Sequence, residues 1–141
     1  MKKESLPPIY ILTEAGKPSS FDPLDGDSTE NLSFARMLYR TPLESGQNDS
    51  LSSSILDEFS YDPKNQIMRW RVNSNQTYSD GSKIQTTDIV LAITRMLAKR
   101  PLFPVIRHID GALAWAKSKH PLKSMPKGIT ITSQTIEIKF I

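Results

Sequence analysis

The chain has 141 residues, which is the length of one ordinary domain with a substantial core. Hydrophobic residues make up 38% and charged residues 23%, and this balance excludes a collagen-like or strongly charged disordered chain. The 18 basic and 15 acidic residues are too evenly mixed for the basic footprint of a nucleic-acid-binding protein, so no nucleic-acid partner is expected. The absence of cysteine excludes disulfides, cysteine-bound zinc, iron–sulfur clusters and a thiol nucleophile.

The first residues are similar to the start of a secretory signal, but only over Met1-Lys2-Lys3. Glu4, Pro7 and Pro8 then stand where the apolar region of a signal peptide should begin. No apolar run in the chain approaches the ~20 residues that a spanning helix needs. Two alternatives follow: a cytoplasmic protein, or a chain from which the signal has been removed.

The first predicted elements lie between residues 9 and 40. The run Ile9–Leu12 is β-branched and aromatic, and it predicts a strand that is buried on both faces. After a loop from Gly16 to Gly26, Ser28 or Thr29 can cap a helix that runs to about Arg40. The helical spacing predicts a buried face made of Leu32, Ala35, Leu38 and Tyr39.

An antiparallel hairpin is predicted in the middle of the chain. The segment Gly46–Ser54 is polar, with four serines, and is predicted to be a mobile loop. Beyond it, Phe59 and Tyr61 alternate with polar residues, and Asp62–Asn65 has turn chemistry. The second strand has Met68, Trp70 and Val72 on one face and Arg69 and Arg71 on the other. The aromatic face is therefore predicted to point into the core and the arginines into water.

Two further helices and a second hairpin are predicted beyond this region. A turn at Ser79-Asp80-Gly81 leads to a helix over about Thr86–Ala98, with an inner stripe of Ile89, Val90, Ile93 and Leu97. Another helix is predicted near Val105–Lys117, with Ile106, Ile109, Leu113 and Ala116 on one side, although Gly111 weakens the pattern. A tight turn at Ser133-Gln134 pairs Ile131 with Ile136 and Ile129 with Ile138.

The sequence contains no recognisable catalytic constellation. His108 and His120 have no other ligand type at helical spacing, and we interpret both as ordinary helix and loop residues. Asp22, Asp25 and Asp27 lack the spacing and the final glutamate of a calcium loop. We therefore expect no enzymatic activity, no metal site and no cofactor.

Several motifs of the chain occur in a characteristic set and order. They are the Phe21-Asp22-Pro23 triplet, the strand Ile67–Val72, the turn Tyr78–Gly81, the helix motifs Asp88-Ile89-Val90 and Arg95-Met96-Leu97, and the hairpin Gly128–Ile138. In this order they resemble one family, the family 5 extracellular solute-binding proteins of peptide-, opine- and nickel-type ABC importers. One departure is Gln85, which stands where the family usually has a capping threonine. Thr86 or Thr87 is therefore expected to cap the helix instead.

The resemblance implies an α+β fold in which antiparallel hairpins pack with helices. This fold would form part of a two-lobed, type II-like periplasmic binding protein. Residues 1–41 would supply the first strand and helix of lobe one. Residues 42–141 would form the inserted α+β subdomain. The chain ends within an apolar strand, so we expect this subdomain to be truncated at its C-terminus.

The implied function is that of a fragment of a non-enzymatic capture component. It would bind peptides, or a nickel- or opine-type solute, and deliver them to the membrane subunits of an ABC permease. The implied location is periplasmic or extracellular and membrane-anchored, with the signal sequence absent from this chain. The alternatives are the solute-sensing domain of a cytoplasmic transcriptional regulator with the same fold and a stand-alone interaction domain.

The resemblance also places candidate ligand-binding residues in the loop after the first strand, which borders the solute in the family. These candidates are Ser19, Ser20, Phe21 and Asp22. The competing interpretation is that Asp22-Pro23 only shapes a turn and that Phe21 packs inside. An incomplete lobe one would also expose apolar surface and lead to self-association, at Ile9, Ile11, Leu32 and Leu38.

Overall fold

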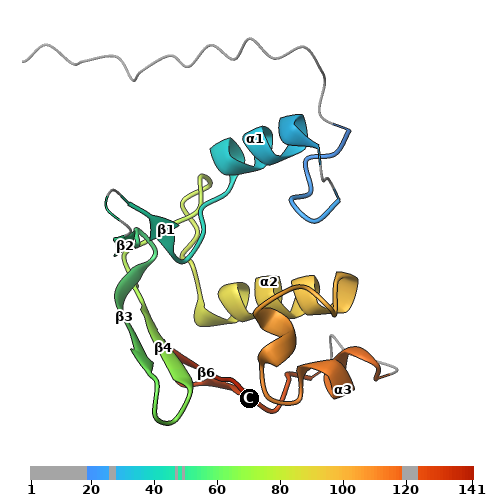
Figure 1. Cartoon of the computed structure of the whole chain (residues 1–141). Helices are drawn as coiled ribbons and strands as arrows, with labels where there is room; N and C mark the ends of the chain where they lie inside the picture. The colour runs from blue at the N-terminus through green and yellow to red at the C-terminus, as the bar shows by residue number, and fades with distance from the viewer. Residues whose placement is uncertain (1–18, 26–27, 47, 49, 119–123) are drawn as a thin grey trace, which may run out of the picture. The chain divides into compact units, whose positions relative to one another are not determined.

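The computed structural model describes residues 19–25, 28–46, 48, 50–118 and 124–141, and it divides into two compact units, Met1–Tyr39 and Arg40–Ile141. Figure 1 shows the elements of each unit in chain order. The predicted strand Ile9–Leu12 lies outside the described residues. Within the described part of the chain, no helix is both long enough and apolar enough to span a membrane.

The first unit contains helix α1, Thr29–Leu38. Ser28 is its N-cap, as predicted, because the Ser28 hydroxyl accepts a hydrogen bond from the Asn31 backbone N–H at 3.2 Å. The predicted inner face is wrong, since Leu32 and Leu38 are 48% and 56% exposed, whereas the polar Asn31 is buried. Leu32 and Leu38 are thus exposed at two of the four positions where apolar surface was expected; Ile9 and Ile11 lie outside the described residues, and self-association stays a prediction.

The second unit is built on a four-stranded antiparallel sheet with the order β3-β4-β6-β5. Its strands are β3 (Leu56–Asp62), β4 (Ile67–Val72), β5 (Ile129–Ile131) and β6 (Thr135–Lys139). Both predicted hairpins are confirmed. In the second, Ile129 pairs with Ile138 and Ile131 with Ile136, in the predicted register. The two hairpins join through β4 and β6, where Trp70 lies opposite Ile136.

On β4 the two faces of the sheet differ as the alternation predicted, with Val72 buried. On β3 the prediction of an inward aromatic face is wrong, since Phe59 and Tyr61 are 36% and 53% exposed. On the polar face, Arg69 Nε lies 2.6 Å from Glu137 Oε1, and Arg71 Nη2 lies 3.1 Å from Glu58 Oε2. The other face packs against helix α2, Thr86–Lys99 (Figure 1). The core between them consists of Ile55, Leu56, Val72, Ile89, Val90, Leu97, Ile109, Ala112, Trp115, Ile129, Ile136 and Ile138.

The prediction of one helix over Val105–Lys117 is wrong. The segment forms a 3₁₀ turn, η2 (Ile106–His108), and a short helix, α3 (Ala112–Ala116). Gly111 separates them with a left-handed φ of +74°, which ends any continuous helix. The backbone there is instead tied to the sheet, because the Asp110 N–H donates to the Lys139 carbonyl at 2.9 Å.

Gly128 lies where this segment meets the sheet. Its N–H donates to the Asp110 carbonyl at 2.8 Å, and its carbonyl accepts from the Lys139 N–H at 2.8 Å. A Cβ on Gly128 would lie only 2.7 Å from the Lys139 carbonyl oxygen and 2.8 Å from the Asp110 nitrogen. The backbones at Asp110, Gly128 and Lys139 therefore approach one another closely, and the lack of a side chain at Gly128 makes this possible.

The predicted mobile loop at Gly46–Ser54 is also partly wrong. Two short strands, β1 (Glu44–Ser45) and β2 (Leu51–Ser52), pair antiparallel across it. The Gly46 N–H donates to the Ser50 carbonyl at 2.8 Å and extends this pairing by one bond. Both strands are exposed, so hydrogen bonding and not burial shapes the segment.

Candidate functional site

The four predicted ligand-binding residues lie in a loop that is folded by its own side chains. Asp22 Oδ1 accepts a hydrogen bond from the Leu24 N–H at 3.0 Å, which makes an Asx turn. The Ser20 hydroxyl accepts from the Asp22 N–H at 3.0 Å and lies 3.2 Å from Asp25 Oδ2, to which it donates. The Asp25 N–H donates to the Asp22 carbonyl at 3.0 Å and closes the turn.

Helix α1 holds this loop through a buried amide. The Ser19 N–H donates to Asn31 Oδ1 at 3.0 Å, and Asn31 Nδ2 donates to the Ser19 hydroxyl at 2.9 Å. The Tyr39 hydroxyl donates to the Phe21 carbonyl at 3.0 Å. The loop is thus tied to both ends of α1. Because each hydrogen bond joins residues more than ten positions apart, the sequence pattern alone did not indicate them.

Phe21 is an exposed apolar side chain of the loop. It is 62% exposed, and its ring meets Phe34 edge-on, with a centroid separation of 6.2 Å and an interplanar angle of 78°. Asp22 is half-buried and shapes the turn. The structure therefore brings all four candidates together, with Phe21 turned toward solvent and Asp22 in a structural role. Contact with a solute stays a prediction.

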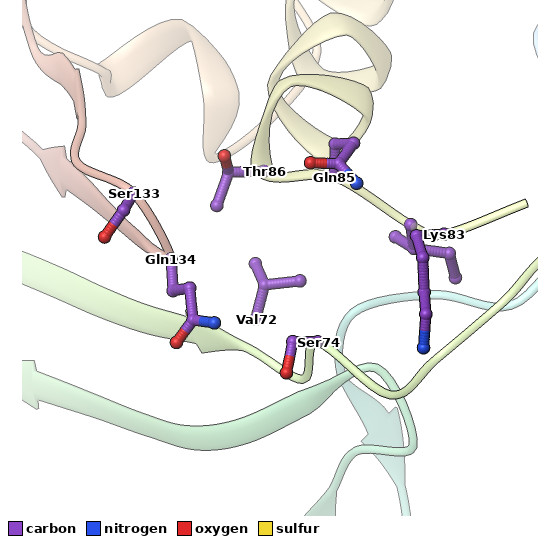
Figure 2. Close-up of a pocket in the computed structure, with 8 residues that line it drawn as sticks. Val72, Ser74, Lys83, Gln85, Thr86, Ser133 and Gln134 are labelled. Carbon is purple, nitrogen blue, oxygen red and sulfur yellow. The ribbon is translucent and has the colours of Figure 1, made fainter.

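A pocket that the sequence reading missed lies in the second unit, at the start of α2. Its volume is about 350 Å³, and it is lined by Val72, Ser74, Lys83, Ile84, Gln85, Thr86, Ser133 and Gln134. Figure 2 shows Val72 between the start of α2, the loop that carries Ser74, and the turn between β5 and β6. Lys83 is the only ionisable group in the lining. The amides and hydroxyls around it can form hydrogen bonds, but they include no catalytic acid or base.

The start of α2 is capped differently from the prediction. Gln85 is itself the N-cap residue, and Asp88 Oδ2 accepts a hydrogen bond from the Gln85 N–H at 2.8 Å. The expectation that Thr86 or Thr87 caps the helix is therefore wrong, because Asp88 satisfies the first free N–H by reaching back.

Partial burial and a hydrogen bond to Asp88 raise the pKa of the Tyr78 phenol above its usual 10.

No metal-binding group is formed by the described residues. Within residues 19–25, 28–46, 48, 50–118 and 124–141, no three His, Asp or Glu side chains gather in an arrangement that could hold an ion. Asp22 and Asp25 are joined by the backbone hydrogen bond from the Asp25 N–H to the Asp22 carbonyl, which closes the turn. The loop therefore offers apolar contact, hydrogen bonding and the carboxylates of Asp22 and Asp25, whereas the pocket offers hydrogen bonding, apolar contact and the positive charge of Lys83.

No protein-family model and no curated protein match the chain in sequence. Solved structures do match its fold. The murein tripeptide binding protein MppA of Escherichia coli has a TM-score of 0.66 and 18% identity over 87% of this chain and 25% of that one. OppA of Listeria monocytogenes, bound to peptide, has a TM-score of 0.69 and 13% identity, with coverages of 90% and 26%.

A nickel-binding protein has the same fold. NikZ of Campylobacter jejuni, in complex with Ni(L-His), has a TM-score of 0.61 and 12% identity, with coverages of 89% and 22%. The chain thus spans about a quarter of the length of the proteins it matches. These matches confirm the predicted fold, a part of a two-lobed periplasmic binding protein with helices packed on antiparallel strands. They belong to the class that the sequence motifs resemble.

Proposed function

We propose that this chain is part of the solute-binding component of an ABC importer and that it belongs to the family 5 solute-binding proteins. The observation that carries the proposal is a fold shared over 87–90% of the chain with proteins that bind peptides or Ni(L-His). The motifs over residues 67–97 support it independently, because they were identified without the fold.

Peptide is the solute that the comparisons favour. The matched structures include a murein tripeptide binding protein, a protein in complex with a nonapeptide and a protein bound to a peptide, whereas one is in complex with Ni(L-His). The mechanism is closure of two lobes around the solute, after which the closed form is delivered to the membrane subunits of the permease. The location is periplasmic or extracellular, and the chain has no catalytic role.

Within this proposal, the loop Ser19–Asp22 contributes an apolar contact through Phe21. The hydrogen bonds that Ser19 exchanges with Asn31, and the one that Tyr39 donates to the Phe21 carbonyl, fix the loop before a solute arrives, so that binding does not have to order it. A single loop leaves most of a peptide in water, where hydrogen bonds contribute little net free energy. The affinity of this chain alone is therefore expected to be about millimolar.

An NMR titration of the ¹⁵N-labelled chain with a library of di- to pentapeptides tests the proposal. Shift changes are expected at residues 19–25, with saturation near ~5 mM. Phe21→Ala should abolish them. Phe103→Ala is the matched control, because Phe103 is also exposed, at 44%, but belongs to the other unit.

Three results would contradict the proposal. The absence of shifts at residues 19–25 up to ~10 mM peptide would remove the loop from the solute site. Saturable micromolar binding by the chain alone would place a complete site within it, and the division of the site between two lobes would be wrong. Equal effects of Phe21→Ala and Phe103→Ala would show that the binding is not specific to the loop.

A further inference from the structure

Strand β3 forms one edge of the four-stranded sheet. Among the described residues it pairs with β4 on one side, and no strand pairs with its other side. Leu56 at its start is buried, but the next five residues, 57–61, are all exposed. The register of β3 against β4 shifts between Leu56 and Glu58, so the regular part of this edge begins at Glu58. At ~3.3 Å per residue, residues 58–61 span about 13 Å of this open edge. An edge of this kind can accept another extended chain.

The apolar face of the sheet continues onto this edge. Phe59 lies opposite Trp70 and Tyr61 opposite Met68 in the β3–β4 register. Trp70 in turn lies opposite Ile136, which is fully buried. Exposure then rises outward, to 36% at Phe59 and 53% at Tyr61. Phe59 and Tyr61 therefore extend the apolar face of the sheet beyond the buried core, and we call these two exposed rings the ledge.

Trp70 adds an unused hydrogen-bond donor beside this ledge. Its indole Nε1 is buried and has no acceptor in the structure. A buried donor without an acceptor is unfavourable, so this indole is sensitive to changes in the packing around it. The indole N–H also provides a probe signal at the ledge.

The charges on β3 select the partner. Asp57, Glu58 and Asp62 are its only ionisable groups besides Tyr61, and the strand carries no basic residue. Hydrogen bonds from the Asn65 side chain and backbone lower the pKa of Asp62, which keeps this carboxyl ionised. A second copy of β3 would bring the same carboxylates together, and like charges across strands are destabilising. A strand with lysine or arginine meets complementary charge.

We propose that β3 is a docking edge for an extended segment of another polypeptide in which apolar residues alternate with lysine or arginine. Its apolar side chains would lie on Phe59 and Tyr61, and its basic side chains beside Asp57 and Asp62. The backbone of the added strand would pair with the outward edge of residues 58–61, and Asp57 would lie at the end of the pairing. This inference does not depend on solute binding, because every residue in it belongs to the second unit.

A capped heptapeptide that alternates valine with lysine is the probe. Titrated into the ¹⁵N-labelled chain, it should shift the amides of residues 57–61 and the indole N–H of Trp70. Affinity should fall by about 3- to 10-fold between ~50 and ~500 mM salt, because the charges at this edge are exposed and screened. Two control peptides are used. One has the same composition with the valines and lysines in blocks, and the other alternates valine with glutamate.

Charge reversal provides the matched variants. Asp57→Lys should weaken binding about 5-fold or more, whereas Glu44→Lys should not, because Glu44 is an exposed strand carboxylate on the separate β1–β2 sheet. Equal binding of the block or glutamate peptide would overturn the proposal, as would equal effects of the two variants. No shift at residues 57–61 up to ~5 mM probe would also overturn it. Concentration-dependent shifts there without peptide would instead identify a second copy of the chain.

Discussion

Adding one methyl group at Gly128 tests how tightly the backbone is packed at the junction of β5, β6 and the Asp110 segment. An alanine Cβ there would lie 2.7 Å from the Lys139 carbonyl oxygen and 2.8 Å from the Asp110 nitrogen, and real Cβ atoms essentially never approach within 3.0 Å. Both neighbours are backbone atoms and cannot rotate away. The strands must separate, which stretches the hydrogen bonds of Gly128 to Asp110 and Lys139.

The expected loss follows from these contacts. Two weakened hydrogen bonds account for about 2 kcal/mol, and forced backbone displacement adds ~1–3 kcal/mol. The lower chain entropy of alanine in the unfolded state offsets ~0.4–1 kcal/mol. Gly128→Ala should therefore lower the free energy of unfolding by about 2–5 kcal/mol. Gly46→Ala is the matched control, because its close neighbour is the Ser50 hydroxyl, a side-chain end that can rotate. It should lower stability by less than ~1 kcal/mol.

Urea unfolding followed by tryptophan fluorescence measures both variants. With an m-value of ~1.5 kcal/mol/M, Gly128→Ala should move the midpoint down by about 2 M at unchanged m. Amide exchange at Asp110 and Lys139 should also become faster. If Gly128→Ala and Gly46→Ala have the same midpoint, the close approach at this junction does not constrain the fold and the argument is refuted.

Three further predictions concern the sheet. Trp70→Phe should lower the free energy of unfolding in urea by less than ~1 kcal/mol, because it keeps an aromatic ring and removes the unpaired indole N–H. Trp70→Ala should lower it by about 3 kcal/mol, and equal losses would contradict this interpretation. A double-mutant cycle between Arg69 and Glu137, each 43% exposed, should give a coupling below ~1 kcal/mol, and a larger value would show that solvent screens the pair less than we assume. Hydrogen bonds from Asn65 lower the pKa of Asp62 below 3.8. The stability that this carboxyl contributes is therefore present above pH 3.8 and is lost as the pH falls through the lowered pKa. Asp62→Ala should make the urea midpoint depend less steeply on pH in acid, and an unchanged slope would count against the assignment.

Patterns that repeat locally were sufficient for much of the second unit. The alternation of isoleucines around Ser133-Gln134 predicted the pairing of Ile131 with Ile136, because a one-residue slip would turn the buried faces outward. The inner stripe of α2 followed in the same way from helical spacing, with Leu97 fully buried. In both cases one buried face contains enough apolar residues to fix the element without knowledge of its partners.

The misses have a common physical origin in contacts between distant parts of the chain. The apolar spacing of residues 105–117 fits a helix, but the left-handed φ of Gly111 and the bond from Asp110 to Lys139 break it. The side-chain amide of Asn31 is buried because it hydrogen-bonds to Ser19, twelve residues away. The helical spacing of apolar residues does not reveal such a polar contact. The loop at Ser19–Asp22 was located by resemblance, and its internal geometry depends on those same side-chain contacts.

The central position of β4 has a consequence for synthesis of the chain. One side of β4 pairs with β3 across a short turn, but the other pairs with β6, and the contacting residues Arg69 and Glu137 are 68 positions apart. Closing a loop of that length has an entropic cost of roughly 4 kcal/mol before any added constant. On the ribosome, the β3–β4 hairpin therefore emerges with Met68 and Trp70 uncovered until β6 has been synthesised. Nascent chains that stall before Thr135 should be held by chaperones or degraded, because their sheet has two open edges.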